Sequence, residues 1–301
     1  MEHKALEVFL KESKIKYKVN EPMREHTSFK TGGPADYYIT VSSAEELNRL
    51  LSKLKETGTP YFILGKGSNL LVSDRGIEGA VISLSELNGI TVNGNEITAG
   101  AGVSLAAVCI TAQKNSLCGM EFAYGIPASV GGALYMNAGA YGGEMSHIVA
   151  RAEYIAEDGS IKTAYPEDMR LGYRTSIFKS NGAVITSVTF KLDFGDGCEI
   201  REKMDCFMER RRSKQPLEYP SAGSTFKRPE GYFAGALIEK NKLKGVSVGG
   251  AQVSQKHAGF IINFNNATSD DVKNLMKKVS DTVFEADGVR LEPEVIFVGR
   301  D

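Results

Sequence analysis

The sequence predicts an α+β protein that contains more than one domain. At 301 residues the chain is long for a single hydrophobic core, so roughly two or three domains are expected. Short apolar runs separated by Asn and Gly turns predict strands, while helical periodicity is confined to a few separate segments. Because strands and helices do not alternate regularly, the pattern favours α+β over a doubly wound sheet.

In the first part of the chain, the apolar spacing predicts a short amphipathic helix over Ala5–Ser13. Ser43 and Glu46 form a capping-box pattern for a helix that ends near Gly58. A helix is also expected over Ser104–Ser116. Short apolar runs predict strands at Tyr61–Leu64, Ala80–Leu84, Ile90–Val92 and Glu96–Ala101.

In the second part, Asp158-Gly159 lies between two runs of strand-forming residues and predicts a β-hairpin over Val149–Ala164. The polar, glycine-rich segment Asp193–Gly197 is expected to break the chain near a domain boundary. Helices are expected over Glu199–Lys214 and Ser269–Ala286, the latter capped by Thr268 and Asp271. Further strands are expected at Ala183–Leu192 and Leu291–Val298.

The most unusual stretch runs from Gly119 to Gly143 and holds seven glycines together with Pro127. So many glycines argue against a stable helix or strand, since each costs roughly 1 kcal/mol in the interior of an element. The stretch is nevertheless too apolar for a solvated loop. It therefore predicts either a buried turn or backbone that approaches a ligand closely.

A second glycine-rich segment, Ile63–Val72, has the sequence ILGKGSNLLV. Successive backbone N–H groups at small residues between two apolar runs form a concave nest that binds phosphate. A Rossmann fingerprint is excluded because Leu70 stands where its last glycine belongs. A P-loop is excluded because Gly67, not Ser or Thr, follows Lys66.

Composition excludes several classes of protein. The net charge of −1 gives no reason to expect a nucleic acid or an anionic membrane as partner. No apolar run reaches the roughly 18 residues of a membrane helix, and the charged N-terminus is not a signal peptide. The four cysteines lack CxxC spacing, which predicts reduced thiols in a cytoplasmic protein and no metal site.

Taken together, six segments resemble the UDP-N-acetylenolpyruvoylglucosamine reductase family. They occur in the order that the family shows, which makes the set far more specific than any one segment. The segments are HTSFKTGGPA (His26–Ala35), ILGKGSNLLV (Ile63–Val72), GIPASVGGALYMNAGAYGGE (Gly125–Glu144), GYRTSIFK (Gly172–Lys179), AGSTFKRP (Ala222–Pro229) and GVRLEPEV (Gly288–Val295).

The resemblance implies a bipartite FAD-binding region of the vanillyl-alcohol-oxidase type and a separate α+β substrate-binding domain. The first FAD-binding subdomain would comprise residues 1–78 and be joined by a C-terminal strand at 290–301. The second would comprise residues 79–194, and the substrate-binding domain residues 195–289. No long insertion separates Gly143 from Arg151, so the chain resembles the shorter of the family's two subtypes.

The resemblance also implies tightly bound, non-covalent FAD, with NADPH as the hydride donor. The substrate would be UDP-N-acetyl-3-O-(1-carboxyvinyl)-glucosamine, reduced to UDP-N-acetylmuramate for peptidoglycan synthesis. The expected FAD-binding residues lie in the glycine-rich segments: Thr31, Gly32, Gly65, Lys66, Gly67, Ser68, Asn69, Leu70, Gly125, Ile126, Pro127, Ser129, Val130, Gly131, Gly132, Asn137, Ala138, Gly139, Ala140 and Tyr141.

Three residues match the family's catalytic positions. Arg174 would hold the enolpyruvyl carboxylate, for which the planar guanidinium is suited. Ser224 would donate a proton, with the neighbouring Thr225 as the alternative. Glu294 would stabilise the developing enol, with Glu292 in reserve because residues two apart share a face of a strand.

Four further residues are candidates for substrate binding. Lys214, Lys227 and Arg228 could pair with the UDP diphosphate or the substrate carboxylate. Tyr232 could stack on uracil or serve as a core or rim residue. The run Arg210–Arg212 is equally typical of a solvated helix end.

Two other readings stay open at this point. The chain could be a different oxidase or dehydrogenase of the same flavin superfamily, or a flavin or nucleotide-sugar binding protein without turnover. A monomer is expected by default.

Overall fold

The computed structural model describes residues 2–300 and contains two compact units. The first unit comprises Met1–Lys18, Tyr37–Lys66 and Gly79–Arg210. The second comprises Val19–Asp36, Gly67–Glu78 and Arg211–Asp301. The division into residues 1–78, 79–194 and 195–289 that the sequence suggested stays a prediction.

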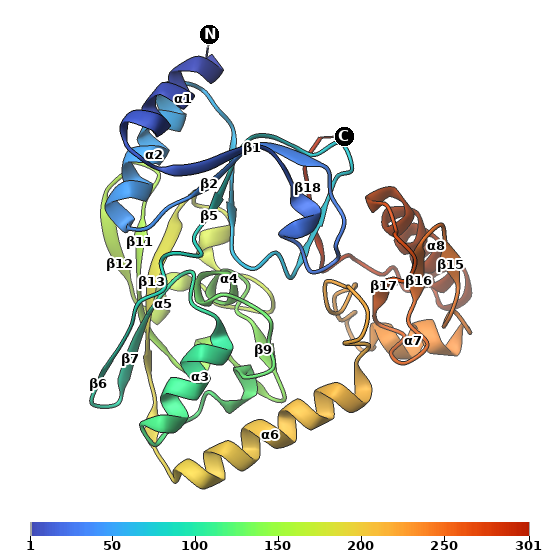
Figure 1. Ribbon diagram of the computed structural model, residues 1–301. Helices are drawn as coiled ribbons and strands as arrows, with labels where there is room; N and C mark the ends of the chain where they lie inside the picture. Colours follow the sequence, from blue (N-terminus) through green and yellow to red (C-terminus); the bar gives the residue numbers. More distant parts are fainter. Residues whose placement is uncertain (1, 301) are drawn as a thin grey trace. The chain divides into compact units, whose positions relative to one another are not determined.

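The centre of the first unit is an antiparallel five-stranded sheet with the order β12-β11-β13-β7-β6 (Figure 1). The predicted hairpin at Asp158-Gly159 is confirmed, because Ile155 pairs with Ile161 across the turn. The strands of this sheet are β6 (Ile90–Asn93), β7 (Glu96–Gly100), β11 (Val149–Ile155), β12 (Ile161–Ala164) and β13 (Val184–Lys191).

A four-stranded sheet has the order β1-β2-β5-β3, with β3 and β5 parallel. The pattern of short apolar runs predicted β3 and most of β5. Strand β1 carries little apolar periodicity, whereas β2 alternates, with Ala35, Tyr37 and Ile39 buried, and was missed although its pattern is typical of a strand. The strands are β1 (Lys16–Pro22), β2 (Pro34–Thr40), β3 (Tyr61–Leu64) and β5 (Ile77–Ser83).

Helix α2 (Ala44–Glu56) follows from its sequence pattern. Leu47, Leu50 and Leu54 form one apolar stripe at helical spacing, and all three are fully buried. The Ser43 hydroxyl accepts the N–H of Glu46 at 3.1 Å, as predicted. The Glu46 carboxylate, however, accepts the backbone N–H of Ser42 at 2.5 Å, so the reciprocal bond of the capping box lies one residue earlier. Helix α1 (Glu2–Glu12) packs against α2.

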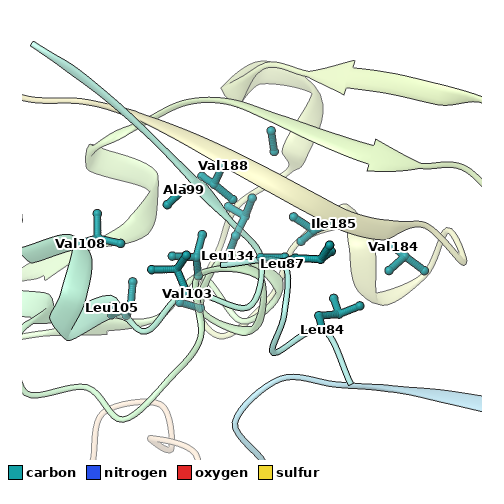
Figure 2. Close-up of a cluster of buried hydrophobic side chains, with 14 of the residues drawn as sticks. Leu84, Leu87, Ala99, Val103, Leu105, Val108, Leu134, Val184, Ile185 and Val188 are labelled. Atoms are coloured by element: carbon teal, nitrogen blue, oxygen red, sulfur yellow. The ribbon is translucent and has the colours of Figure 1, made fainter. Parts of the chain in front are cut away.

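The glycine-rich stretch contains a helix, which corrects the expectation that it would avoid regular structure. Helix α4 (Val130–Tyr135) begins after Ser129, whose hydroxyl accepts the N–H of Gly132 at 3.4 Å. It packs against β7 and β13, and Leu134 lies among the buried side chains drawn in Figure 2. The N-cap and this burial outweigh the poor helix propensity of two glycines. The strand pair β9 (Gly139–Ala140) and β10 (Gly143–Glu144) follows.

Two longer helices complete the first unit's framework. Helix α3 (Leu105–Lys114) begins after Ser104, as predicted, and buries Leu105, Val108, Cys109 and Ala112. The segment expected to break the chain instead forms β14 (Asp193–Phe194), paired with β8 (Leu117–Cys118), and leads into α6 (Gly197–Lys214). The division between the units falls within α6, after Arg210. A short helix α5 spans Pro166–Met169.

In the second unit, helices α7 and α8 lie beside a three-stranded antiparallel sheet (Figure 1). The predicted capping box of α8 is confirmed: Thr268 and Asp271 each bond the other's backbone N–H at 3.0 Å. Gly288 ends the helix in the left-handed region, with φ of 70°. The elements are α7 (Ala234–Lys240), α8 (Ser269–Asp287), β15 (Ser247–Val248), β16 (Ala251–Val253) and β17 (Ile261–Asn263).

The strand expected over Leu291–Val298 is shorter than predicted. Only β18 (Ile296–Val298) is a regular strand, and it runs parallel to β4 (Leu70–Val72). The preceding residues pair with the segment around Phe226, which lies opposite Pro293. Throughout residues 2–300, none of the helices combines the length and apolar character that crossing a bilayer requires.

Candidate active site

The nest loop and the start of α4 meet at two glycines of the first unit. A Cβ atom at Gly65 would lie 2.5 Å from the Ser129 hydroxyl oxygen and 3.9 Å from the Cα of Gly132. Gly65 and Gly132 are both exposed, so backbone without side chains is presented at this junction. Such a surface suits a planar ligand that lies directly on the main chain.

In the second unit, the rest of the nest is interlocked with the segment after His26. Gly67 has φ of 60°, and a Cβ atom there would lie 2.1 Å from the His26 carbonyl oxygen. The carbonyl of Gly67 accepts the N–H of Ser28 at 3.1 Å. Lys66 is exposed and Ser68 is half-buried. Gly67 is thus required both by its left-handed conformation and by the close backbone contact.

Thr31 provides an orphaned polar group in the same unit. Its side chain is only 3% exposed, and its hydroxyl oxygen has no hydrogen-bond partner among the described residues. Buried hydroxyls are almost always hydrogen-bonded in native proteins. An unpaired hydroxyl in a predicted FAD segment therefore fits a polar atom of a bound cofactor. The adjacent Gly32, with φ of 118°, packs against Val72.

The two remaining nest residues contribute to the framework. Asn69 donates its side-chain N–H to the carbonyl of Glu294 at 3.1 Å and accepts the N–H of Ile296 at 3.0 Å. Leu70 is buried at the start of β4. Asn69 therefore joins the nest to the C-terminal segment.

The predicted isoalloxazine segments mix core positions with exposed backbone. Val130 and Gly131 are buried, and Gly131 packs against Ala101, where an added Cβ would approach to 2.8 Å. Pro127 is exposed, so a ligand can reach the chain at this point. The remaining positions, Gly125, Ile126, Ala138, Gly139 and Ala140, are half-buried.

Asn137 and Tyr141 have conformations that the sequence did not predict. Both adopt left-handed φ values, 42° and 53°. The Asn137 side chain is fully buried and bonds to Gly172 and Ser146, so it fixes the protein framework and leaves only its backbone for a cofactor. The Tyr141 ring is 40% exposed and stacks on Phe207 of α6, at 4.6 Å between ring centroids and 2° between planes.

The structure brings Arg174 to the predicted flavin segment of the first unit. Its Nη2 donates to the carbonyl of Gly139 at 3.3 Å, and its guanidinium lies 5.1 Å from the ring centroid of Tyr173. Its φ of 54° is unusual for a residue other than glycine. Lys179 donates to its carbonyl at 3.2 Å. Backbone strain of this kind is concentrated at functional sites.

Within the second unit, Ser224 and Thr225 differ sharply in environment. Ser224 is exposed, whereas Thr225 is 1% exposed and its hydroxyl accepts the N–H of Ile261 at 2.9 Å. Thr225 also donates its N–H to Gly259 at 2.9 Å. Thr225 therefore anchors the segment, and of these two residues only Ser224 is accessible from outside the protein.

The segment of Ser224 is hydrogen-bonded to that of the two candidate glutamates. The carbonyl of Thr225 accepts the N–H of Glu294 at 2.9 Å, and Lys227 donates its N–H to Glu292 at 2.8 Å. The Glu292 side chain is 70% exposed and forms an ion pair with Lys227 at 3.0 Å. Glu294 is half-buried. Glu292 is thus engaged in a surface ion pair.

The predicted substrate-binding residues also belong to the second unit. Lys214 is exposed at the end of α6, and Lys227 is engaged with Glu292. The Arg228 guanidinium lies 3.9 Å from the ring centroid of Phe233, a cation–π contact. Tyr232 is 49% exposed, which makes it a rim residue and not a core one.

The sequence patterns assigned no role to Glu144 of β10. The Ser146 hydroxyl holds the pKa of this carboxyl below its ordinary value, and Asn137, His147 and Arg174 act in the same direction. One sequence signal could have identified it: Glu121 and Glu144 flank residues 122–143, a run without any charged side chain. Among the side chains that the structure describes, those of residues 5–300, no group of three His, Cys, Asp or Glu is arranged to hold a metal ion.

Comparisons with known proteins bear on both units. A family model described as FAD binding domain matches residues 35–165, and one described as UDP-N-acetylenolpyruvoylglucosamine reductase, C-terminal domain, matches residues 215–298. The UDP-N-acetylenolpyruvoylglucosamine reductase of Clostridium perfringens strain 13 is 51% identical over 283 residues, which cover 94% of this chain and 93% of the relative. That of Clostridium novyi is 49% identical over 299 residues, covering 99% and 97%.

A solved structure agrees with these relatives. The UDP-N-acetylenolpyruvylglucosamine reductase of Thermus caldophilus superposes with a TM-score of 0.81 at 35% sequence identity. The match covers 94% of this chain and 98% of that protein. The predicted α+β class, with an FAD-binding region and a separate C-terminal domain, is therefore confirmed.

Proposed function

The chain belongs to the UDP-N-acetylenolpyruvoylglucosamine reductase family, and from this membership we propose that it reduces UDP-N-acetyl-3-O-(1-carboxyvinyl)-glucosamine to UDP-N-acetylmuramate for peptidoglycan synthesis. It is an FAD-dependent oxidoreductase, with FAD and NADPH as its cofactors. When bound, FAD would supply the redox chemistry, namely hydride transfer from NADPH to the terminal vinyl carbon of the substrate. The residues of the chain supply placement, electrostatics and the proton.

Gly65 and Gly132 would present bare backbone to the FAD, and Thr31 would offer it the otherwise unpaired hydroxyl. These features support FAD binding because each leaves room or hydrogen-bonding capacity that the protein itself does not use. The Gly65–Asn69 loop would hold the pyrophosphate through successive N–H groups. All other predicted FAD contacts remain part of this proposal.

Arg174 would hold the carboxylate of the enolpyruvyl group. A guanidinium can bind a carboxylate through two parallel hydrogen bonds. As the hydride reaches the vinyl carbon, negative charge develops on the carbon next to the carboxylate and on the carboxylate itself. A guanidinium already held by the Gly139 carbonyl would stabilise this charge with little reorganisation.

Ser224 would then donate a proton to the carbon that bears the carboxylate, which completes the addition of a hydride and a proton across the double bond. The observation that carries this assignment is the pairing of its segment with that of Glu294, through the 2.9 Å bond from Glu294 N–H to the Thr225 carbonyl. This pairing puts the exposed hydroxyl and the half-buried carboxyl on neighbouring segments. Glu294, when protonated, would donate a hydrogen bond to the developing enol.

Lys214, Lys227, Arg228 and Tyr232 are proposed to bind the UDP portion of the substrate. Lys214 is exposed, and the Lys227 and Tyr232 side chains are about half exposed, which supports contact with a ligand. The pairing of Lys227 with Glu292 implies that a diphosphate would displace a surface carboxylate, an exchange of similar charge-assisted bonds.

The experiment measures two half-reactions of the purified Ser224→Ala variant separately: reduction of FAD by NADPH and reoxidation of FAD by the substrate. Anaerobic NADPH should still bleach the FAD absorbance, whereas reoxidation by the enolpyruvyl substrate should slow by about 10²–10⁴-fold, the usual contribution of a general acid. Ser247→Ala, a change at an exposed serine of β15, serves as the control. Product formation by Ser224→Ala at the unmutated rate would overturn the assignment. Rapid reoxidation by oxygen, with none by the substrate, would instead indicate an oxidase.

We also propose a cytoplasmic location. All four cysteines, Cys109, Cys118, Cys198 and Cys206, are free thiols, which is typical of a reducing compartment. The monomeric state remains a prediction that gel filtration of the holoenzyme can test.

A further inference from the structure

A carboxylate stands beside Arg174 on a short strand pair of the first unit. In the β9–β10 pair, Glu144 lies directly opposite Gly139. The carbonyl of Gly139 is also the group that accepts the Nη2–H of Arg174 at 3.3 Å. Gly139 has no side chain to separate its neighbours, and an added Cβ would lie 2.8 Å from the Cβ of Glu144. Glu144 and Arg174 thus converge on one glycine.

A buried amide fixes the two segments that carry these residues. The Asn137 side chain, 0% exposed, donates to the carbonyl of Gly172 at 3.0 Å, two residues before Arg174. Its oxygen accepts the N–H of Ser146 at 2.9 Å, two residues after Glu144. One side chain therefore holds both loops, and breaking either bond would leave a buried polar group unpaired.

The Glu144 carboxylate is in turn held in place. The Ser146 hydroxyl donates to its Oε1, and the His147 ring lies 3.9 Å from the same oxygen. This hydroxyl is the main reason that the pKa of Glu144 is lowered, and the charge of Arg174 acts in the same sense. The carboxylate is therefore ionised at neutral pH and attracts the guanidinium.

We propose that Glu144 is a positioning residue that orients the Arg174 guanidinium toward the substrate carboxylate. This inference rests on the proposed role of Arg174 in carboxylate binding. Arginine has five N–H donors arranged in a rigid fork, so restraint on one edge fixes the direction of the other. The left-handed backbone of Arg174 is held by the same framework, with Lys179 donating to its carbonyl. Glu144 sets direction and charge, and itself contacts neither substrate nor cofactor.

The test is a double-mutant cycle on the holoenzyme with Glu144→Gln, Arg174→Ala and the double variant. Glutamine keeps an oxygen for Ser146 and removes only the charge, so the thermal midpoint should stay near that of the unmutated enzyme. We expect Glu144→Gln to lower the rate of flavin reoxidation by the substrate about tenfold, because the negative charge that attracts the guanidinium is removed. Reduction by NADPH should change by less than about twofold.

Glu153→Gln is the matched control, because Glu153 is an exposed glutamate of β11 whose carboxylate also accepts a serine hydroxyl, that of Ser187 at 2.9 Å. It should leave both half-reactions unchanged. In the Arg174→Ala background, the further change Glu144→Gln should have less than about a twofold effect.

Two failures can be told apart. If Arg174→Ala slows reoxidation but Glu144→Gln does not, or if their effects multiply, the positioning role is overturned while the proposed function stands. If Arg174→Ala itself leaves reoxidation unchanged, the carboxylate-binding role of Arg174 falls, and the inference with it.

Discussion

Replacing Gly67 by alanine tests how tightly the nest loop is built. Gly67 and Gly94 have nearly the same positive φ, 60° and 58°. They differ in surroundings: a Cβ at Gly67 would lie 2.1 Å from the His26 carbonyl oxygen, whereas nothing lies within 4 Å of a Cβ at Gly94. Comparing Gly67→Ala with Gly94→Ala therefore separates the contact from the conformation.

The expected magnitudes follow from this difference. A left-handed conformation costs an L-residue about 1–2 kcal/mol, which both variants should lose. Gly67→Ala must in addition move backbone, because the crowded atoms are the main chain of residues 26 and 27. Overpacking of this kind typically costs a further ~1–3 kcal/mol. We therefore expect a loss of about 2–5 kcal/mol in the free energy of unfolding for Gly67→Ala, against about 1–2 for Gly94→Ala.

The assay is urea denaturation of both variants, with and without added FAD. An excess of FAD should stabilise Gly94→Ala as much as the unmutated protein and should stabilise Gly67→Ala less, since the stabilisation by a cofactor that binds only the folded state grows with the logarithm of its concentration divided by Kd. Equal stability of the two variants, or equal stabilisation by FAD, would refute the reasoning that the nest depends on this close backbone approach.

Three further predictions concern the framework around the site. Leu134→Ala, which truncates a fully buried side chain of α4, should cost about 3–5 kcal/mol and loosen FAD; a loss below about 1 kcal/mol in urea denaturation would contradict this packing. Thr268→Ala removes the hydroxyl that accepts the N–H of Asp271 and should cost about 1 kcal/mol, measured in the same way, whereas Thr268→Ser should restore most of it. Burial lowers the pKa of His257 below its ordinary 6.5, and the nearby Lys244 acts in the same direction. The stability of the folded protein should therefore fall as the pH drops below 6.5 toward the lower folded-state pKa, because the unfolded chain binds the proton more readily. In His257→Asn, the thermal midpoint should change less with pH across that range.

Local sequence patterns located the elements whose burial follows a simple period. The leucine stripe of α2 and the cap residues of α8 each specify a helix without reference to the rest of the chain. Strand β3 was likewise predicted with its observed bounds, Tyr61–Leu64. Helix α4 was missed because propensity counted its glycines against it. Its Ser129 cap is local, but its packing against β7 and β13 involves residues distant in sequence.

The candidate site shows the same division between local and long-range information. The glycines of the nest and Arg174 could be singled out from sequence because their residue types are unusual for their neighbourhoods. The network of Asn137, Ser146 and Glu144 could not, because it depends on the register of β9 and β10 and on a loop more than 30 residues away. Ser224 was likewise named from the sequence with Thr225 as the alternative, but the burial of Thr225, whose hydroxyl accepts the N–H of Ile261, could not be predicted from local pattern.

The parallel pairing of β18 with β4 has a consequence for how the protein is made. Ile296 pairs with Leu70, and the second unit combines residues 19–36 and 67–78 with residues after 210. During synthesis, β4 must wait without its partner strand until residues 296–298 have left the ribosome. Contacts between such distant segments form slowly, and unpaired apolar strands are prone to aggregation. Folding of the growing chain can therefore be completed only after residues 296–298 have been made. Removal of β18 should leave β4, which follows the nest loop, without its partner strand.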